Sequence, residues 1–89
     1  MSEQKLAQAI SLSRSGQKLE ARQILNGILE TDPQIEAAWL WLADTYSETP
    51  ERIRVLEECI RHIPDSQIVQ KWLATFKAKE EEKKAEAGG

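Results

Sequence analysis

The stretch AAWLWLADTY, residues 37–46, places two tryptophans two residues apart in a segment with the apolar spacing of a helix. Two residues along an α-helix correspond to about 200° of rotation, so Trp39 and Trp41 are expected to point to very different sides. A helix on the surface of a compact bundle needs only one apolar stripe. We therefore expect this helix to be central, with Trp39 packed towards the preceding helices and Trp41 towards the following ones. The alternative is that one indole lies in a groove and stacks on a partner.

The rest of the chain divides into segments of helical length. A glycine or a proline interrupts it about every 14–17 residues, and no stretch shows the strict alternation of a half-buried strand. Helices are expected over residues 2–15, 18–31, 34–47, 50–63 and from 66 towards 82. The short connections between them force consecutive helices to pack antiparallel. The sequence thus predicts an all-α fold.

Local signals support these boundaries. The pairs Asp32–Pro33 and Thr49–Pro50 have the form of an N-cap residue followed by proline at the first helical position, where the missing N–H has no cost. Gly16 suits a tight turn. Asp65 or Ser66 can cap the last helix.

The chain also contains an internal repeat. ARQILNGILETDP (residues 21–33) aligns with RIRVLEECIRHIP (residues 52–64) at a shift of 31 residues, and the same shift carries Trp41 onto Trp72. A repeated helix pair followed by one extra helix indicates an α-solenoid with a terminal cap. We expect one domain over residues 1–82 and a disordered, charged and glycine-ending tail over residues 83–89.

These segments resemble the tetratricopeptide repeat (TPR) family, whose unit is a helix-turn-helix of 34 residues. GQKLEARQILNGILETDP (residues 16–33) is similar to the second half of a unit, and AAWLWLADTY to the first half of the next, with Trp39 at the family's tryptophan position. The likeness covers about residues 2–76 and includes TPR-like segments often found in bacterial proteins. It departs from the family at Lys5, where a tryptophan would stand, and in a second unit three residues short. It implies about two TPR-like units plus a C-terminal capping helix.

The resemblance also implies a concave groove lined by the first helix of each unit. The positions that would line it here are Leu6, Ile10, Arg14, Leu40, Asp44, Glu48, Lys71 and Thr75. The lysine, asparagine and arginine residues with which well-known TPR grooves clamp a C-terminal carboxylate are absent from the matching positions. The expected ligand is instead a helix or an extended segment of a partner protein with apolar anchors.

The charge distribution limits the classes of partner. The net charge is −3, and the interval between Arg22 and Arg52 contains acidic residues but no lysine or arginine. Such a region repels phosphate backbones, so nucleic-acid binding is disfavoured, whereas a basic partner would be attracted. The simpler interpretation is a solvated acidic face. The chain has no apolar run near 18 residues and no secretory signal, and a lone cysteine fits a reducing compartment, so we expect a cytoplasmic protein without a membrane span.

No constellation of reactive side chains is evident. Cys59 and His62 are the only cysteine and histidine, and a zinc site needs three or four ligands. Cys59 is expected to be a packed core thiol, and His62 to lie at the end of a helix. We therefore expect no catalytic residue, no metal and no cofactor. The leading hypothesis is a non-catalytic protein–protein interaction module, and the alternative is a homodimer formed by stacking of repeats or exchange of the C-terminal helix.

Overall fold

The computed structural model describes the backbone of residues 2–88 and the side chains of residues 3–84. It contains five helices, which are α1 (Ser2–Arg14), α2 (Lys18–Thr31), α3 (Glu36–Asp44), α4 (Thr49–His62) and α5 (Gln67–Gly88). No strand occurs among the described residues, and the all-α prediction is confirmed. No helix in this part of the chain has both the length and the apolar character needed to cross a membrane.

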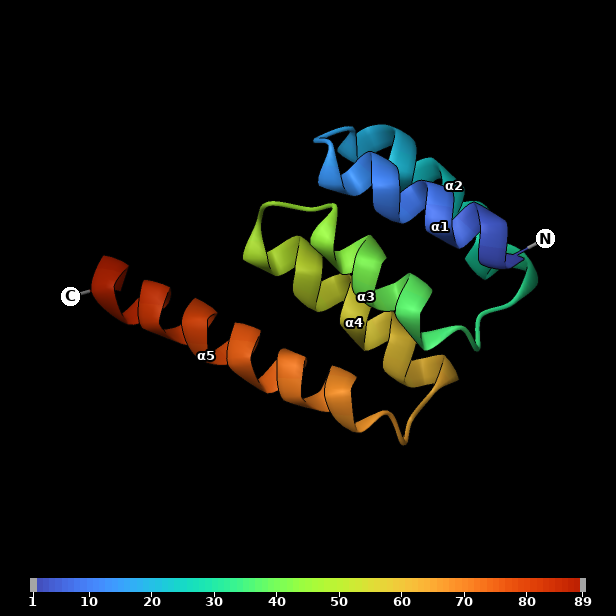
Figure 1. Ribbon diagram of the computed structural model, residues 1–89. Helices are drawn as coiled ribbons and strands as arrows, with labels where there is room; N and C mark the ends of the chain where they lie inside the picture. The colour runs from blue at the N-terminus through green and yellow to red at the C-terminus, as the bar shows by residue number, and fades with distance from the viewer. Residues whose placement is uncertain (1, 89) are drawn as a thin grey trace.

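The helices follow one another across the molecule in chain order (Figure 1). Helices α1 and α2 form one hairpin, α3 and α4 form a second, and α5 lies along α4. Each helix packs mainly against its neighbours in the chain, and α3 also contacts α1. Helix α3 is therefore covered by the first hairpin on one side and by α4 on the other, in agreement with the prediction of a central helix.

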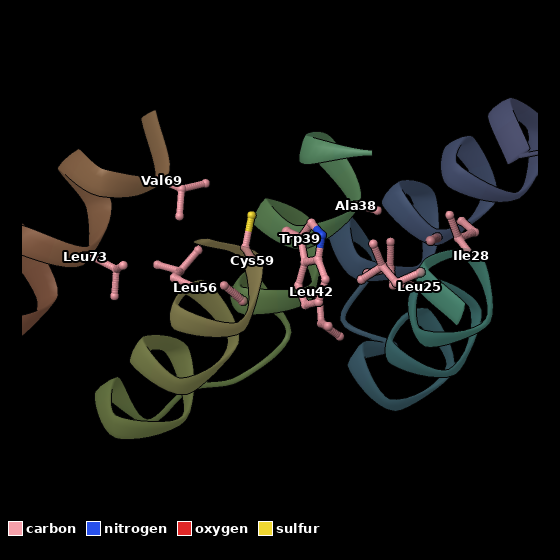
Figure 2. Packing of buried hydrophobic residues seen from close by; sticks show 12 residues of the cluster. Leu25, Ile28, Ala38, Trp39, Leu42, Leu56, Cys59, Val69 and Leu73 are labelled. Carbon is pink, nitrogen blue, oxygen red and sulfur yellow. The ribbon is translucent and has the colours of Figure 1, made fainter. Parts of the chain in front are cut away.

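One continuous apolar core runs through all five helices (Figure 2). Its buried members are Ala9 of α1, Leu25, Ile28 and Leu29 of α2, Ala38, Trp39, Leu42 and Ala43 of α3, Leu56 and Cys59 of α4, and Val69 and Leu73 of α5. The apolar positions of α2 and α4 recur at helical spacing, so each of these helices turns one stripe towards the core.

The start of α3 differs from the prediction. The helix begins at Glu36, with Ile35 as its N-cap residue, and Pro33 lies in the preceding turn. The side chain of Asp32 accepts a hydrogen bond from the backbone N–H of Gln34 at 3.3 Å. The assignment of Asp32 as N-cap and Pro33 as first helical residue is therefore wrong. An aspartate side chain can accept a hydrogen bond from a backbone N–H in a turn as readily as from one at the start of a helix, and here Asp32 does so in the turn.

The end of α3 is also earlier than predicted, at Asp44 rather than at residue 47. Two arginines from neighbouring helices hold the turn that follows. Nη2 of Arg22 donates to the carbonyl of Thr45 at 2.9 Å, and Nε of Arg52 donates to the carbonyl of Tyr46 at 2.6 Å. The Arg22 guanidinium also lies 3.8 Å from the centroid of the Tyr46 ring. These contacts bind carbonyl groups that a longer helix would have used internally.

Other boundaries agree more closely. Helix α4 begins one residue earlier than predicted, so that Glu48 rather than Thr49 is its N-cap residue. Of the two predicted candidates, Asp65 and Ser66, it is Ser66 that caps α5, because its hydroxyl accepts a hydrogen bond from the backbone N–H of Val69 at 3.3 Å. Gly16 has a φ of +90°, a conformation that favours glycine, in the turn between α1 and α2.

The 31-residue repeat recurs in the hydrogen bonds of the two equivalent turns. Nε1 of Trp39 donates to the carbonyl of Pro33 at 2.8 Å. Nε2 of Gln70, 31 residues after Trp39, donates to the carbonyl of Pro64 at 2.8 Å. Two different side chains thus close the corresponding turns in the same way.

Helix α5 continues to Gly88, past residue 82, where the domain was predicted to end. Lys77 joins its middle to Glu57 of α4, with 3.1 Å between Nζ and the carboxylate. The division into a domain over residues 1–82 and a tail over residues 83–89 stays a prediction.

Candidate functional site

One surface of α3 and α5 carries two adjoining hollows of about 330 Å³ each. The first is lined by Leu40, Trp41, Asp44 and Trp72. The second is lined by Ala43, Asp44, Arg52, Trp72, Thr75 and Phe76. Asp44 and Trp72 belong to both, so the two hollows form one surface, which we call the α3–α5 groove.

Helical spacing brings these side chains together. Leu40 and Asp44 are four residues apart on α3, and Trp72 and Phe76 are four residues apart on α5, so each pair lies on one face of its helix. The two helices present equivalent positions, because Trp41 and Trp72 are related by the 31-residue repeat. The groove is therefore built from corresponding faces of α3 and α5.

The two tryptophans of α3 have different environments. Trp39 is buried, and its ring stacks on that of His62 in α4, with 5.7 Å between centroids and 21° between planes. Trp41 is only partly buried, and the guanidinium of Arg14 in α1 lies 5.7 Å from its ring centroid. Each indole thus also meets a helix on the side opposite to the predicted one, since Trp39 stacks on a residue of α4 and Trp41 lies under a residue of α1. Trp41 nevertheless shares a hollow with Trp72 of α5, a following helix, as predicted. A spacing of two residues fixes the angle between the side chains but not the rotation of the helix about its axis.

Trp72 is more exposed than the repeat suggested. The repeat relates Trp72 to Trp41 and so favours a structural role for both, but Trp72 is 36% exposed and meets Phe76 edge-on at 6.3 Å between centroids. Ile68, one turn earlier on α5, is 43% exposed. The indoles of Trp41 and Trp72 thus border the groove. For the pair Trp39 and Trp41, the alternative interpretation placed one indole in a groove, and Trp41 is the one that borders it here.

Asp44 is the acidic centre of the groove. Its Oδ2 accepts hydrogen bonds from Nζ of Lys18 at 3.3 Å and from Oγ of Ser13 at 3.5 Å. Nζ of Lys18 also donates to Oγ of Ser13 at 2.9 Å, which links α1, α2 and α3. The Asp44 side chain is 45% exposed despite these contacts. No hydrogen bond from the described part of the chain reaches its other oxygen, Oδ1.

Arg52 forms one wall of the second hollow. Its Nε donates a hydrogen bond to the carbonyl of Tyr46, and its guanidinium lies 5.7 Å from the Phe76 ring centroid. Its position is thus fixed by the turn after α3 and by α5 together. The groove residues that were not predicted are Trp41, Ala43, Arg52, Trp72 and Phe76. Arg52 was missed because nothing in the sequence indicates that α4 contributes a side chain to this face.

The predicted groove residues occupy several places. Leu40, Asp44 and Thr75 line the two hollows, and Arg14 lies over Trp41. Leu6 packs against the core. The remaining residues are Ile10, partly exposed on α1, Glu48, exposed before α4, and Lys71, which lines a separate shallow depression on α5 with Gln67, Ile68 and Gln70. That all eight belong to one binding site stays a prediction.

Cys59 and His62 lie apart from the groove. Cys59 is fully buried, and this burial, with a smaller contribution from the negative charge of Glu36, raises the pKa of its thiol to about 11. His62 Nε2 is 3.9 Å from a carboxylate oxygen of Glu58. Within the residues described, no three histidine, cysteine, aspartate or glutamate side chains are grouped so as to hold a metal ion.

Comparison of the chain with protein-family models, with curated proteins and with solved structures gave no significant match. Function is therefore inferred from the α3–α5 groove and from its charges.

Proposed function

We propose that the protein is a non-catalytic interaction module that binds a peptide or helix of a partner protein in the α3–α5 groove. The observation that carries this proposal is the pair of incompletely buried indoles, Trp41 and Trp72, on either side of a hollow of about 330 Å³. Tryptophan is among the residues that contribute most to protein–protein binding. A partner that covers both rings would remove apolar surface from water on a scaffold that is already folded.

The apolar surface continues along α5. Ile68 and Trp72 are the exposed large apolar residues of this helix, and they are four residues apart on one face. Leu40 and Trp41 supply the matching apolar surface on α3. A contiguous exposed apolar patch rimmed by charged residues is typical of a docking surface. An amphipathic helix or an extended segment with spaced apolar anchors would fit such a strip.

We further propose that the five helices form a TPR-like α-solenoid, in which α5 is the capping helix. The turn bonds of Trp39 and Gln70 support two equivalent units. The starts of α3 and α5 are also linked, since the Ser66 hydroxyl donates to a Glu36 carboxylate oxygen at 2.6 Å. On α5, the side away from Val69 carries exposed Gln67, Lys71, Ala74 and Ala78. Two of these four residues, Gln67 and Lys71, are polar, and a polar outer face is what a terminal cap requires.

Affinity capture from the native host tests the interaction proposal. Trp72→Ala and Leu40→Ala should each reduce recovery of the bound protein at least about tenfold, the usual effect of truncating a central contact. Leu19→Ala is the matched control, because Leu19 is 69% exposed on α2 and lies outside the groove. Partners that are retained by both groove variants, or lost equally with Leu19→Ala, would overturn the assignment of this surface.

Exchange of α5 between two chains is the second candidate function. Helix α5 packs chiefly against α4, and a turn of four residues, 63–66, joins the two helices. A helix held by one neighbour through a short hinge can pass to a second copy without new contacts. Sedimentation equilibrium from micromolar to millimolar concentration tests this, and a monomer throughout the range would exclude it.

A further inference from the structure

We propose that the hollow between Trp41, Asp44 and Trp72 binds the guanidinium group of an arginine side chain supplied by the partner. This inference rests on the proposed function and adds the chemistry of the bound segment to it. Three features of the groove carry it. Among the described residues, the carboxylate of Asp44 has one oxygen without a hydrogen bond, the indole of Trp72 has no cation on its face, and any occupant would remove water from the negative charge of Asp44.

The carboxylate of Asp44 can accept further hydrogen bonds. The contacts from Lys18 and Ser13 both go to Oδ2, and the side chain is 45% exposed. An ionised carboxylate has about four acceptor positions over its two oxygens. Because Asp44 lines both hollows, a donor in either hollow lies beside this carboxylate.

The chain's own arginines already lie over three of the aromatic rings near this surface. Arg14 lies over Trp41, Arg22 over Tyr46 and Arg52 over Phe76, at 5.7, 3.8 and 5.7 Å from guanidinium carbon to ring centroid. In the described part of the chain, the aromatic contact of Trp72 is its edge-on meeting with Phe76, and no cation lies over its indole. A cation over an indole is attracted by the negative face of the ring, and more strongly when water is excluded.

The chemistry of burial selects a cationic occupant. An apolar side chain in the hollow would remove water from the free oxygen of Asp44, Oδ1, without giving it a donor, and a desolvated carboxylate oxygen without a hydrogen bond is unfavourable even though Lys18 pairs with Oδ2. A guanidinium supplies both the donors and the positive charge, and its flat face stacks on an indole, which an ammonium group does less well.

A short peptide provides the direct test. The probe is acetyl-Leu-Arg-Leu-amide, and its control has citrulline in place of arginine, which keeps the shape and removes the charge. Binding is followed by the indole N–H signals of the three tryptophans in ¹⁵N-correlated NMR spectra. We expect the signals of Trp41 and Trp72 to shift, that of buried Trp39 to stay, and the citrulline peptide to bind at least about fivefold more weakly. Equal binding of the two peptides would overturn the inference.

The two halves of the Lys18–Asp44 ion pair give matched variants with opposite expectations. Asp44→Asn should weaken binding of the arginine peptide about fivefold or more. Lys18→Gln removes the competing cation and should leave binding equal or tighter. A purely structural role for the ion pair predicts the same change in both variants, and that result would contradict the inference. Trp72→Leu, at an exposed position, should also weaken binding about fivefold. This variant tests the inference even if Asp44→Asn does not fold.

Affinity capture separates this inference from the proposed function. If Leu40→Ala and Trp72→Ala lose the native partner while Asp44→Asn retains it, the interaction module stands and the arginine site is wrong. If the arginine peptide binds as expected but no captured protein depends on the groove, the site stands and the proposed function is wrong.

Discussion

Trp39 has two structural roles, one in the core and one in the turn before α3. It fills the core beside His62 while its Nε1 closes the turn at Pro33. A buried carbonyl that loses its donor has a cost of about 1–3 kcal/mol. The same indole therefore contributes both packing and turn geometry.

Trp39→Phe removes the donor and leaves a small void, and we expect the free energy of unfolding to fall by about 2 kcal/mol. Urea unfolding followed by far-UV circular dichroism measures the change. Trp72→Phe is the matched control and should change the free energy by less than about 0.5 kcal/mol, since Trp72 is exposed. An equal loss in both variants would contradict the role of the Pro33 bond.

Cys59 gives the protein a dependence on alkaline pH. Its thiol has a pKa of about 11 in the fold against an ordinary value of 9.0. A folded-state pKa above the unfolded one means that the stabilisation is complete below pH 9 and is lost as the pH rises towards 11. Between pH 8 and pH 10.5 this should lower the free energy of unfolding by about 2 kcal/mol.

Urea unfolding of the parent and of Cys59→Ala at both pH values checks this, because other alkaline titrations are common to the two proteins. The fall with pH should be smaller in the variant. Identical slopes would show that the thiol titrates alike in the folded and unfolded chains.

At the scale of elements, the sequence located the helices well and their absolute rotations poorly. Periodic apolar residues and turn signals led to five helices, and α2 was predicted with its observed bounds. The ends of α3 were missed because the local signals at Asp32 and Pro33 serve a turn equally well, and because arginines distant in sequence hold the turn after Asp44. Trp72 was expected to share a structural role with Trp41. Trp41 does pack against the core, but Trp72 is 36% exposed, since an apolar residue at helical spacing does not reveal which helix faces carry no neighbour.

The two glycines near α2 should respond to alanine in opposite ways. Gly16→Ala forces a side chain into a backbone conformation with φ of +90° and should destabilise the fold by about 1 kcal/mol. Gly27 lies inside α2 with open space around it, and Gly27→Ala should stabilise the fold by about 0.5–1 kcal/mol. Thermal and urea unfolding of both variants measure the pair. A loss at Gly27 would show a close approach there that the structure does not contain.

Arg22 should control the turn that ends α3. Arg22→Gln removes the bonds to Thr45 and the contact with the Tyr46 ring, so we expect a loss of about 1–2 kcal/mol. Hydrogen exchange at residues 45–48 should also become faster. Arg54→Gln is the control, because Arg54 is 77% exposed and its 3.8 Å pair with Glu51 is worth little. Unchanged exchange in Arg22→Gln would mean that the turn holds without this residue.

At the scale of the whole molecule, the single core joins all five helices. Leu56 is fully buried on α4 within this core, with Val69 and Leu73 of α5 on one side and Trp39 and Leu42 of α3 on the other (Figure 2). Leu56→Ala should lower the free energy of unfolding by about 3 kcal/mol. We expect tryptophan fluorescence and far-UV circular dichroism to report one shared transition. Two separated transitions would show that the first hairpin unfolds independently of the rest.

The uneven exposure of the three tryptophans has a practical consequence. Water around Trp41 and Trp72 shifts their emission to longer wavelength, whereas Trp39 emits from a dry interior. Any molecule that fills the space between the two wet rings must shift the spectrum towards the blue and hinder quenching by iodide. The unlabelled protein is thus its own optical sensor for screening occupants of that space.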